Sequence, residues 1–345
     1  MQNLFKSLVI EESPDGSFSS SIKKKSISDL PIGELLIKVS YSSLNYKDAL
    51  SVSGNKGVTR SYPHTPGIDA VGIVENSETE KFKIGDEVIV SGFDLGMNTS
   101  GGFGQYIRVP NKWACHLPNG LSALDSMVIG TAGLTAGLSA YELKKLNGID
   151  GREAVITGAT GGVGTFAIKI LNILGAKITA ITSKKDCEGF LKSLGADKII
   201  LTDDFLNSVR KPMNRGTWDI AIDVVGGDIL SCLIPSMKYG GTIVCCGNVA
   251  GPNFEASVFP YILRANRLIG IDSAETPIKK KKKIWNLFGK EWKMDDLQKL
   301  YKLVTINEIM PEINKILSGN QIGRVVLSHK SVSYTHLTLP TNREV

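Results

Sequence analysis

The sequence is poor in the residues that bind metals and form disulfides. Its 345 residues include five cysteines and four histidines, and no two cysteines form a C-x-x-C pair. Cys245 and Cys246 are adjacent within an apolar run that is typical of a buried strand. This cysteine usage argues against a disulfide-stapled secreted domain and favours a protein that is kept reduced in the cytoplasm.

Long apolar runs and a large excess of one charge are also lacking. The best candidate for a membrane span, residues 127–140, is interrupted by glycine and threonine, and a span needs about 20 apolar residues. Residues 1–8 have neither the apolar core nor the cleavage site of a signal peptide. The net charge of +6 suits anionic ligands but is small for a nucleic-acid-binding protein. We therefore expect small-molecule ligands, with neither nucleic acid nor a membrane as partner.

Glycine, in contrast, is concentrated at one informative place. Residues 154–157 form a short apolar run, after which Gly158, Gly161 and Gly164 follow at the spacing G-x-x-G-x-x-G. A helical pattern and a second strand at 176–182 complete a strand–helix–strand unit. Glycines let backbone N–H groups approach a diphosphate, which then lies at the positive end of the helix. The pattern predicts a dinucleotide site, and in this context a tight turn without a ligand is the weaker alternative.

The end of that second strand indicates which dinucleotide binds. An NAD site usually has an acidic side chain there, which accepts hydrogen bonds from the ribose 2′-hydroxyl. Here Thr182 and Ser183 precede Lys184 and Lys185, and hydroxyl and ammonium groups suit a 2′-phosphate. Asp186 stands beyond the expected turn. We expect NADPH as the cofactor, and a solvated loop is the alternative.

The part of the chain before about residue 120 shows short strands separated by turn residues. These strands are expected at residues 34–40, 70–74, 87–90 and 105–109. From about residue 122, strands alternate with helices, and the segment 121–146 is expected to be largely helical. Parallel strands are expected at 177–182, 198–202, 219–224 and 241–246. A basic helical segment that begins at 279–283 then leads back to a strand at 324–327.

Several motifs together resemble one known family. They are SSLNYKDAL at 42–50, PGID at 66–69, GTAGLTA at 130–136, TGATGGVG at 157–164, LKSLGA at 191–196 and ILRANRLIGIDS at 262–273. The chain resembles the medium-chain dehydrogenase/reductase superfamily over nearly its whole length. The first and last of these motifs are most similar to its branch of NADPH-dependent acrylyl-CoA reductases, which are also described as quinone oxidoreductases.

The resemblance implies an α/β fold of two domains. Residues 1–121 and 268–330 would form a GroES-like, β-rich catalytic domain. Residues 122–267 would form a Rossmann domain that binds NADPH with a doubly wound parallel sheet. Residues 331–345 have no counterpart in the family, so we expect a foreign or disordered tail. We also expect a homodimer.

The zinc ligands of related alcohol dehydrogenases are missing. Those enzymes have a catalytic cysteine and a Gly-His-Glu motif where this chain has residues 45–48, NYKD, and 67–69, GID. The region that would carry four structural cysteines contains only Cys115, and His64 and His116 have no partner at a ligand spacing. We expect no bound metal. Without a Lewis acid, hydride addition to an activated C=C bond is favoured over alcohol or ketone chemistry.

The resemblance implies a reaction at the start of the first expected helix. NADPH would deliver hydride to the β-carbon of acryloyl-CoA, and the thioester oxygen would carry the enolate charge before propanoyl-CoA forms. Asn45 would offer amide donors, Tyr46 would pack on the nicotinamide or hold its ribose, and Asp48 would orient its neighbours. The alternative for this trio is a hydrogen-bonded helix start with no chemical role.

The resemblance also assigns cofactor contacts residue by residue. The diphosphate would be held by Thr160, Gly161, Gly162 and Val163. The 2′-phosphate would be held by Thr182, Ser183 and Lys184. Further contacts, with the adenine and the nicotinamide half among others, are expected from Tyr46, Thr202, Asn248, Ile262, Ser273 and Asn320.

Two other functions stay open at the level of sequence. One is a quinone or alkenal reductase that uses the same NADPH site with a different acceptor pocket. The other is a non-catalytic NADPH-binding protein. The five lysines at 279–283 are expected to form a solvated helix face, and a contact with the phosphates of CoA is the alternative.

Overall fold

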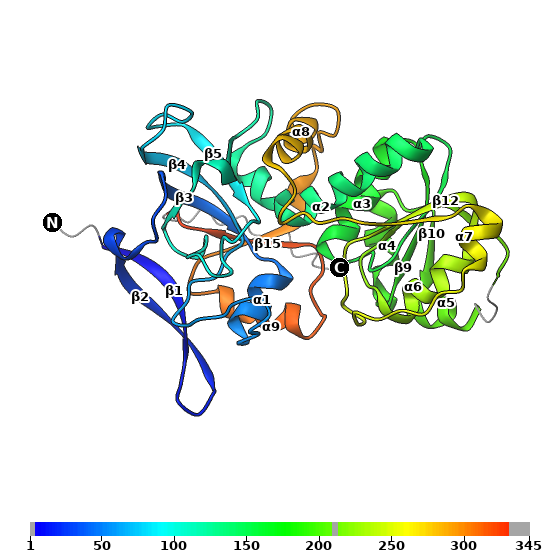
Figure 1. Cartoon of the computed structure of the whole chain (residues 1–345), viewed down its shortest axis with the longest axis horizontal. Helices are drawn as coiled ribbons and strands as arrows, with labels where there is room; N and C mark the ends of the chain where they lie inside the picture. Colours follow the sequence, from blue (N-terminus) through cyan, green and yellow to red (C-terminus); the bar gives the residue numbers. More distant parts are fainter. Residues whose placement is uncertain (1–3, 209–212, 331–345) are drawn as a thin grey trace, which may run out of the picture.

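A computed structural model describes residues 4–208 and 213–330. It contains two large sheets that lie side by side, with the N-terminal hairpin at one end of the molecule (Figure 1). The hairpin strands are β1 (Leu4–Glu12) and β2 (Phe18–Ser26). The expected tail at 331–345 lies outside the described residues.

One of the two sheets has seven strands and is built from both ends of the chain. Its order is β14-β15-β3-β4-β5-β7, and β6 also pairs with β3. The strands are β3 (Leu35–Ser43), β4 (Asp69–Ser77), β5 (Glu87–Ser91), β6 (Tyr106–Val109), β7 (Ala114–His116), β14 (Tyr301–Val304) and β15 (Arg324–Ser328). Its helices are α1 (Tyr46–Val52), α8 (Ile278–Phe288) and α9 (Ile309–Leu317). β15 pairs with β3, so the end of the chain returns to its beginning.

The other sheet has six strands, and all of its pairings are parallel. Its order is β10-β9-β8-β11-β12-β13. The strands are β8 (Glu153–Ile156), β9 (Lys177–Thr182), β10 (Lys198–Leu201), β11 (Trp218–Asp223), β12 (Met237–Cys245) and β13 (Arg267–Gly270). The helices between them are α3 (Gly162–Ile173), α4 (Glu188–Leu194), α5 (Thr202–Ser208), α6 (Gly227–Leu233) and α7 (Phe259–Arg264). The α/β fold class expected from the sequence is confirmed.

The long helix α2 (Ala123–Asn147) joins the two sheets. It packs on α3 and on β3 and β4, and one apolar core runs from Val71 and Ile89 through Leu134 to Ile156. Gly130 interrupts the helix with φ 52° and ψ −161°. The segment expected to be largely helical is therefore two helical pieces, and only glycine adopts that backbone conformation without strain.

The return to the first sheet comes later than the sequence suggested. The expected boundary between residues 267 and 268 falls inside β13, which pairs with β12 in the six-stranded sheet. Arg267 to Gly270 pair in parallel with Thr242 to Cys245, so they belong to the six-stranded sheet. The division into domains remains a prediction, with this boundary moved to follow Gly270. No helix in 4–208 or 213–330 is long and apolar enough to cross a membrane.

The lysine run only partly forms a solvated face. Lys281 of α8 is 1% exposed, and its Nζ donates to the carbonyls of Ser91 and Ala274 at 2.7 Å each. It also lies 3.6 Å from the ring centroid of Phe93. Burial lowers the pKa of Lys281 to about 8. The expectation that all five lysines are solvated is therefore wrong for Lys281, because helical periodicity turns that position toward β5.

Candidate functional site

The turn between β8 and α3 is shaped by its glycines. Gly158 has φ +58°. A Cβ at Gly164 would lie 2.4 Å from the Gly158 carbonyl oxygen, so α3 packs on the turn more closely than any side chain permits. Gly161 precedes the helix in an extended conformation. The first N–H groups of a helix have no partner within it and carry the positive end of its dipole. These features fit a diphosphate.

Polar side chains gather at the carboxyl end of β9. Thr182 is buried, its hydroxyl lies 3.5 Å from that of Thr160, and it accepts the Lys184 N–H at 3.2 Å. Ser183 is exposed beside them. The Lys184 Nζ donates to the carbonyl of Gln321, in the loop between α9 and β15. The three residues predicted to hold the 2′-phosphate therefore lie next to a loop from the other sheet.

The start of α1 is fixed by a buried carboxyl group. Asp48 is 0% exposed. One of its oxygens accepts the Asn45 N–H at 2.8 Å, and the other accepts the N–H groups of Gly67 and Ile68 at 3.0 and 2.9 Å. Burial raises the pKa of Asp48 to about 7, against the lowering effect of these hydrogen bonds. These hydrogen bonds tie the start of α1 to the backbone at Gly67 and Ile68, and the expected role of Asp48 in the site remains a prediction.

The side chain of Asn45 is held in one orientation by two charged partners. Its Nδ2 donates to Asp69 at 2.8 Å, and its Oδ1 accepts from Arg324 Nη2 at 3.1 Å. A carboxylate needs a donor and a guanidinium needs an acceptor, so the amide cannot be turned round. Asp69 also accepts the Thr131 N–H and hydroxyl, both at 2.7 Å. Thr131 follows the break at Gly130, which frees its N–H from the helix.

Arg324 lies where the two sheets meet. Its Nε donates to Val128 O at 3.1 Å and its Nη1 to Leu44 O at 3.2 Å. A Cβ at Gly162, the first residue of α3, would lie 2.9 Å from Arg324 Nη1, and a Cβ at Gly130 would lie 2.9 Å from Nη2. The guanidinium therefore fills the space between Asn45, the break in α2 and the glycine turn.

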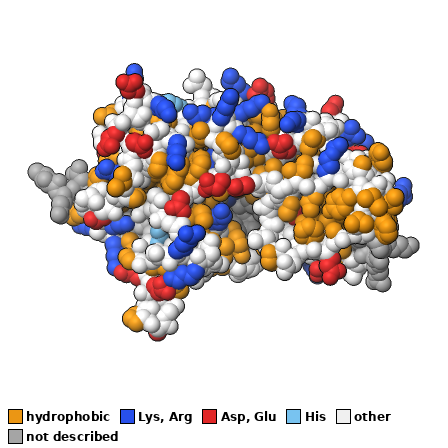
Figure 2. Space-filling model, viewed as in Figure 1, with side chains coloured by type: hydrophobic (Ala, Val, Ile, Leu, Met, Phe, Trp, Pro, Cys, Tyr) orange, Lys and Arg blue, Asp and Glu red, His pale blue; other side chains and the backbone are white. Residues whose placement is uncertain are grey.

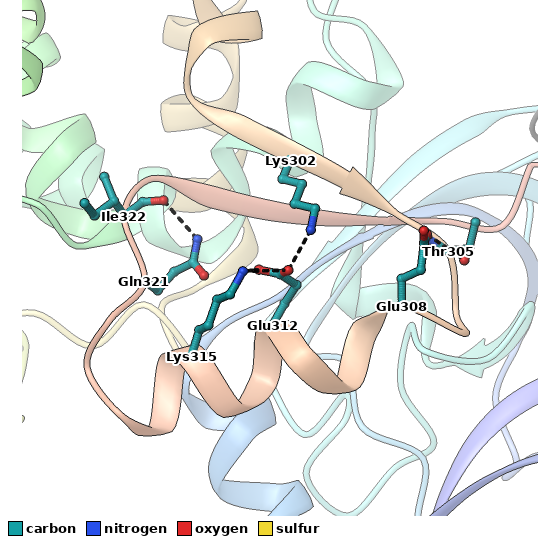
Figure 3. A network of polar contacts seen from close by, with 7 residues as sticks. All are labelled: Lys302, Thr305, Glu308, Glu312, Lys315, Gln321 and Ile322. Carbon is teal, nitrogen blue, oxygen red and sulfur yellow. Dashed lines mark hydrogen bonds and ion pairs between the residues drawn. The ribbon is translucent and has the colours of Figure 1, made fainter. Parts of the chain in front are cut away.

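The chain that leads to Arg324 is held by a small polar network (Figure 3). Glu312 of α9 is 3% exposed and accepts Lys302 of β14 at 2.8 Å and Lys315 at 3.0 Å. In the loop that follows, Gln321 Nε2 donates to Ile322 O at 2.9 Å. These contacts fix α9 and its loop, so that β15 enters the sheet with Arg324 at its first position.

Comparisons with known proteins identify the family. A family model described as "Alcohol dehydrogenase GroES-like domain" matches residues 31–119, and one described as "Zinc-binding dehydrogenase" matches 162–288. The acrylyl-CoA reductase AcuI of Ruegeria pomeroyi is 36% identical over 326 residues, which are 94% of this chain and 99% of that protein. The chain belongs to the medium-chain dehydrogenase/reductase superfamily. The resemblance seen in the sequence is thereby confirmed.

Solved structures of this superfamily share the fold over nearly the whole chain. The yhdH oxidoreductase of Salmonella enterica, in complex with NADP, has a TM-score of 0.90 at 36% identity, and the match covers 94% of this chain and 100% of that one. The protein yhfP of Bacillus subtilis, with NAD bound, has a TM-score of 0.91 at 36% identity, covering 94% and 99%. The structural match to both relatives therefore includes both sheets of this chain.

The residues around Asn45 do not fit the zinc ion of the superfamily's alcohol dehydrogenases. Zinc needs thiolates, imidazoles or carboxylates that converge on one point. Here the Asn45 amide lies between the carboxylate of Asp69, to which it donates, and the guanidinium of Arg324, from which it accepts. Within 4–208 and 213–330, no group of three or more His, Cys, Asp or Glu is placed to hold a metal. His64 is buried against Gly96 O at 2.9 Å, and His116 lies 3.0 Å from Asp86.

The other predicted cofactor residues lie at several places around these groups. Ser273 hydrogen-bonds Thr135 of α2 at 2.8 Å. Tyr46, at the first position of α1, is 40% exposed, and Asn248 is exposed after β12. Thr202 directly follows β10, and Asn320 is exposed in the loop beside Lys184. Ile262 is 68% exposed on α7.

The sequence interpretation missed Asp69, Thr131 and Arg324 as members of the site. Each stood in a segment that carried the family resemblance or the returning strand. A signal was present for Asp69, which replaces the glutamate of the Gly-His-Glu motif in zinc enzymes. Arg324 is separated from Asn45 by 279 residues, and no local pattern indicates that they meet.

Proposed function

We propose that this chain catalyses the NADPH-dependent, zinc-independent reduction of an activated C=C bond, with acryloyl-CoA as substrate and propanoyl-CoA as product. The observation that carries the proposal is the Arg324–Asn45–Asp69 network beside the glycine turn. The name of the Ruegeria pomeroyi relative and the NADP complex of the Salmonella enterica relative support the substrate and the cofactor. A cytoplasmic location remains a prediction.

The residues of the chain divide the work as follows. Bound NADPH would supply the hydride that adds to the β-carbon, and a proton from water would then add to the α-carbon to give propanoyl-CoA. The N–H groups at the start of α3 hold its diphosphate, while Thr182 and Lys184 hold its 2′-phosphate. Arg324 donates to the Asn45 oxygen, and Asp69 accepts one hydrogen of the Asn45 amide nitrogen, which fixes the direction of the other hydrogen. That second amide hydrogen makes only a long contact with Ser43 O at 3.4 Å, which it exchanges for the substrate. That hydrogen stabilises the enolate oxygen of the thioester, and Tyr46 bounds the nicotinamide side of the site.

Two alternatives use the same geometry. A quinone or alkenal reductase would need only a different acceptor pocket above Asn45. A non-catalytic NADPH-binding protein would retain the glycine turn and the end of β9 without needing a polarised amide. The network around Asn45 favours an enzyme over a binding protein, because buried polar and charged groups next to a cofactor turn are typical of reactive sites.

The reaction is tested by following NADPH oxidation with acryloyl-CoA, crotonyl-CoA, a simple enone and a quinone. We expect acryloyl-CoA to have the highest kcat/KM. Asn45→Ala should lower kcat on the order of a hundredfold, because one donor to a developing oxyanion is lost. The Kd of NADPH should change far less. Efficient quinone reduction without any turnover of acryloyl-CoA would contradict the substrate assignment but not the fold or the cofactor.

Coenzyme choice is tested at Lys184. We expect the wild type to bind NADPH more tightly than NADH, and Lys184→Asp to weaken NADPH binding at least tenfold, because a charged partner of the 2′-phosphate contributes roughly 1.5–3 kcal/mol. The matched control is Lys185→Asp, which makes the same charge change at an exposed neighbour. Fluorescence titration of both coenzymes measures the effect. Equal losses in the two variants would exclude a specific role for Lys184.

We also propose that two copies of the chain associate through α7 and the edge strand β13. An apolar patch is exposed there (Figure 2), and its residues include Val258 at 64%, Ile262 at 68% and Leu263 at 60%. β13 ends the described strand order, so its outer edge is open for a second copy. The expected contact of Ile262 with the cofactor also remains a prediction.

Sedimentation velocity tests the association. We expect the wild type to sediment as a dimer and Leu263→Glu to sediment as a monomer, because a buried unpaired carboxylate opposes an apolar interface. Ile84→Glu places the same charge at a side chain that is 71% exposed in the turn between β4 and β5, and this variant should remain dimeric. A wild type that stays monomeric at micromolar concentration would refute the dimer.

A further inference from the structure

One side of α8 carries a line of lysines that the site described above does not use. Lys279, Lys282, Lys283 and Lys290 are all exposed. They border an open groove of about 330 Å³, together with Asn286 and Glu291. The spacing of Lys279, Lys282 and Lys283 places them on one face of α8, and Lys290 follows two residues after the helix ends at Phe288. The opposite face is buried through Lys281, Ile284, Trp285 and Phe288.

These lysines are poorly neutralised by the protein itself. Among the described residues, no ion pair is formed by Lys279, Lys282 or Lys290, and Lys283 donates to the hydroxyl of Tyr141. A merely solvated helix face usually alternates acidic and basic residues, since like charges three or four residues apart destabilise a helix. Glu291 is the only acid at this groove in the described part of the chain. The arrangement therefore favours a polyanionic ligand.

The groove lies beside the second half of α2, whose first half reaches the site. Lys280 pairs with Glu142 at 2.6 Å, and Lys283 lies 4.5 Å from the ring centroid of Tyr141. From Thr131, which contacts Asp69, α2 rises to Tyr141 over ten residues, or about 15 Å. An extended pantetheine arm with two amide units matches four to five peptide residues, also roughly 15 Å.

A second hollow is bordered by α2, by α8 and by the segment that leads from β13 to α8. It has a volume of about 280 Å³ and is lined by Leu138 of α2, by Asp272, Glu275 and Thr276, and by Lys280 of α8. Ser273 in the same segment hydrogen-bonds Thr135, four residues after Thr131. The acids in this hollow would repel phosphate but accept the N–H groups of an uncharged pantetheine arm. The charges thus change from acidic in this hollow to basic at the α8 groove.

We propose that the α8 groove binds the 3′-phosphate and diphosphate of the CoA ester while the acyl end reaches Asn45. This inference rests on the proposed function, because it assigns a binding site to the nucleotide end of the same CoA ester. Lys279 and Lys282 act as the main phosphate contacts. Lys283 and Lys290 increase the positive electrostatic potential of the groove. The groove selects acyl-CoA over an acyl group on pantetheine alone.

The experiment compares two substrates in two charge-matched double variants. Lys279→Gln/Lys282→Gln removes the groove charges, and Lys144→Gln/Lys145→Gln removes two exposed lysines near the end of α2. The groove variant should raise the KM for acryloyl-CoA about three- to tenfold over the control, as expected for two solvent-exposed charge pairs. With acryloyl-pantetheine the two variants should be indistinguishable. Equal KM values for acryloyl-CoA would overturn the proposal.

A binding measurement separates this proposal from the proposed function. Calorimetry of free CoA, with NADP⁺ at saturation to block the cofactor's own phosphate sites, should show weaker binding in the groove variant than in the control. The difference should shrink as salt is added. Inorganic phosphate in place of CoA should bind far more weakly, and equal binding would indicate a generic anion site and contradict the assignment. If acryloyl-CoA is not reduced, the proposed function fails, while selective CoA binding would still support the groove.

Discussion

The hydrogen bonds of the buried Arg324 guanidinium are the interaction on which the arrangement of the site depends. They reach Leu44 and Asn45 before and at α1, and Val128 in the first half of α2. Burying a guanidinium is unfavourable unless its donors are satisfied and an opposite charge is near. Asp69 supplies that charge through Asn45. The first residue of α3 lies within contact distance of the same guanidinium. Arg324 therefore fixes the position of the glycine turn relative to Asn45.

The backbone leaves space for the hydrogen bonds of Arg324 and Asp69 at the break in α2. Gly130 breaks α2, and any Cβ there would meet Ser43, Arg324 and Asp69 within 3 Å. The break releases the N–H of Thr131 toward Asp69, which an unbroken helix would not allow. In the superfamily's zinc enzymes a metal ion supplies the positive charge at this place. Here a fixed cation and an oriented amide are present, and they suit the stabilisation of an enolate better than the activation of an alcohol.

The sequence predicted the local elements of this structure but not the long-range contacts that bring them together around Arg324. The glycine turn, the end of β9 and most strands follow from short patterns, because each depends on neighbouring residues. The break in α2 did not follow, since Gly130 lies in an apolar run that suits a continuous helix. Arg324 and Asp69 did not follow either, because strand pairing over long separations brings them together. The burial of Lys281 depends likewise on how α8 packs against β5.

The most direct test of the account is Arg324→Lys, which retains the charge but loses the planar fork that holds Asn45. Steady-state kinetics with acryloyl-CoA should show kcat reduced at least tenfold. The Kd of NADPH should stay within about threefold, since the turn itself is unchanged. Arg152→Lys, at an exposed position before β8, serves as the matched control and should behave as the wild type. An unchanged kcat in a folded Arg324→Lys variant would contradict the claim that this guanidinium organises the site.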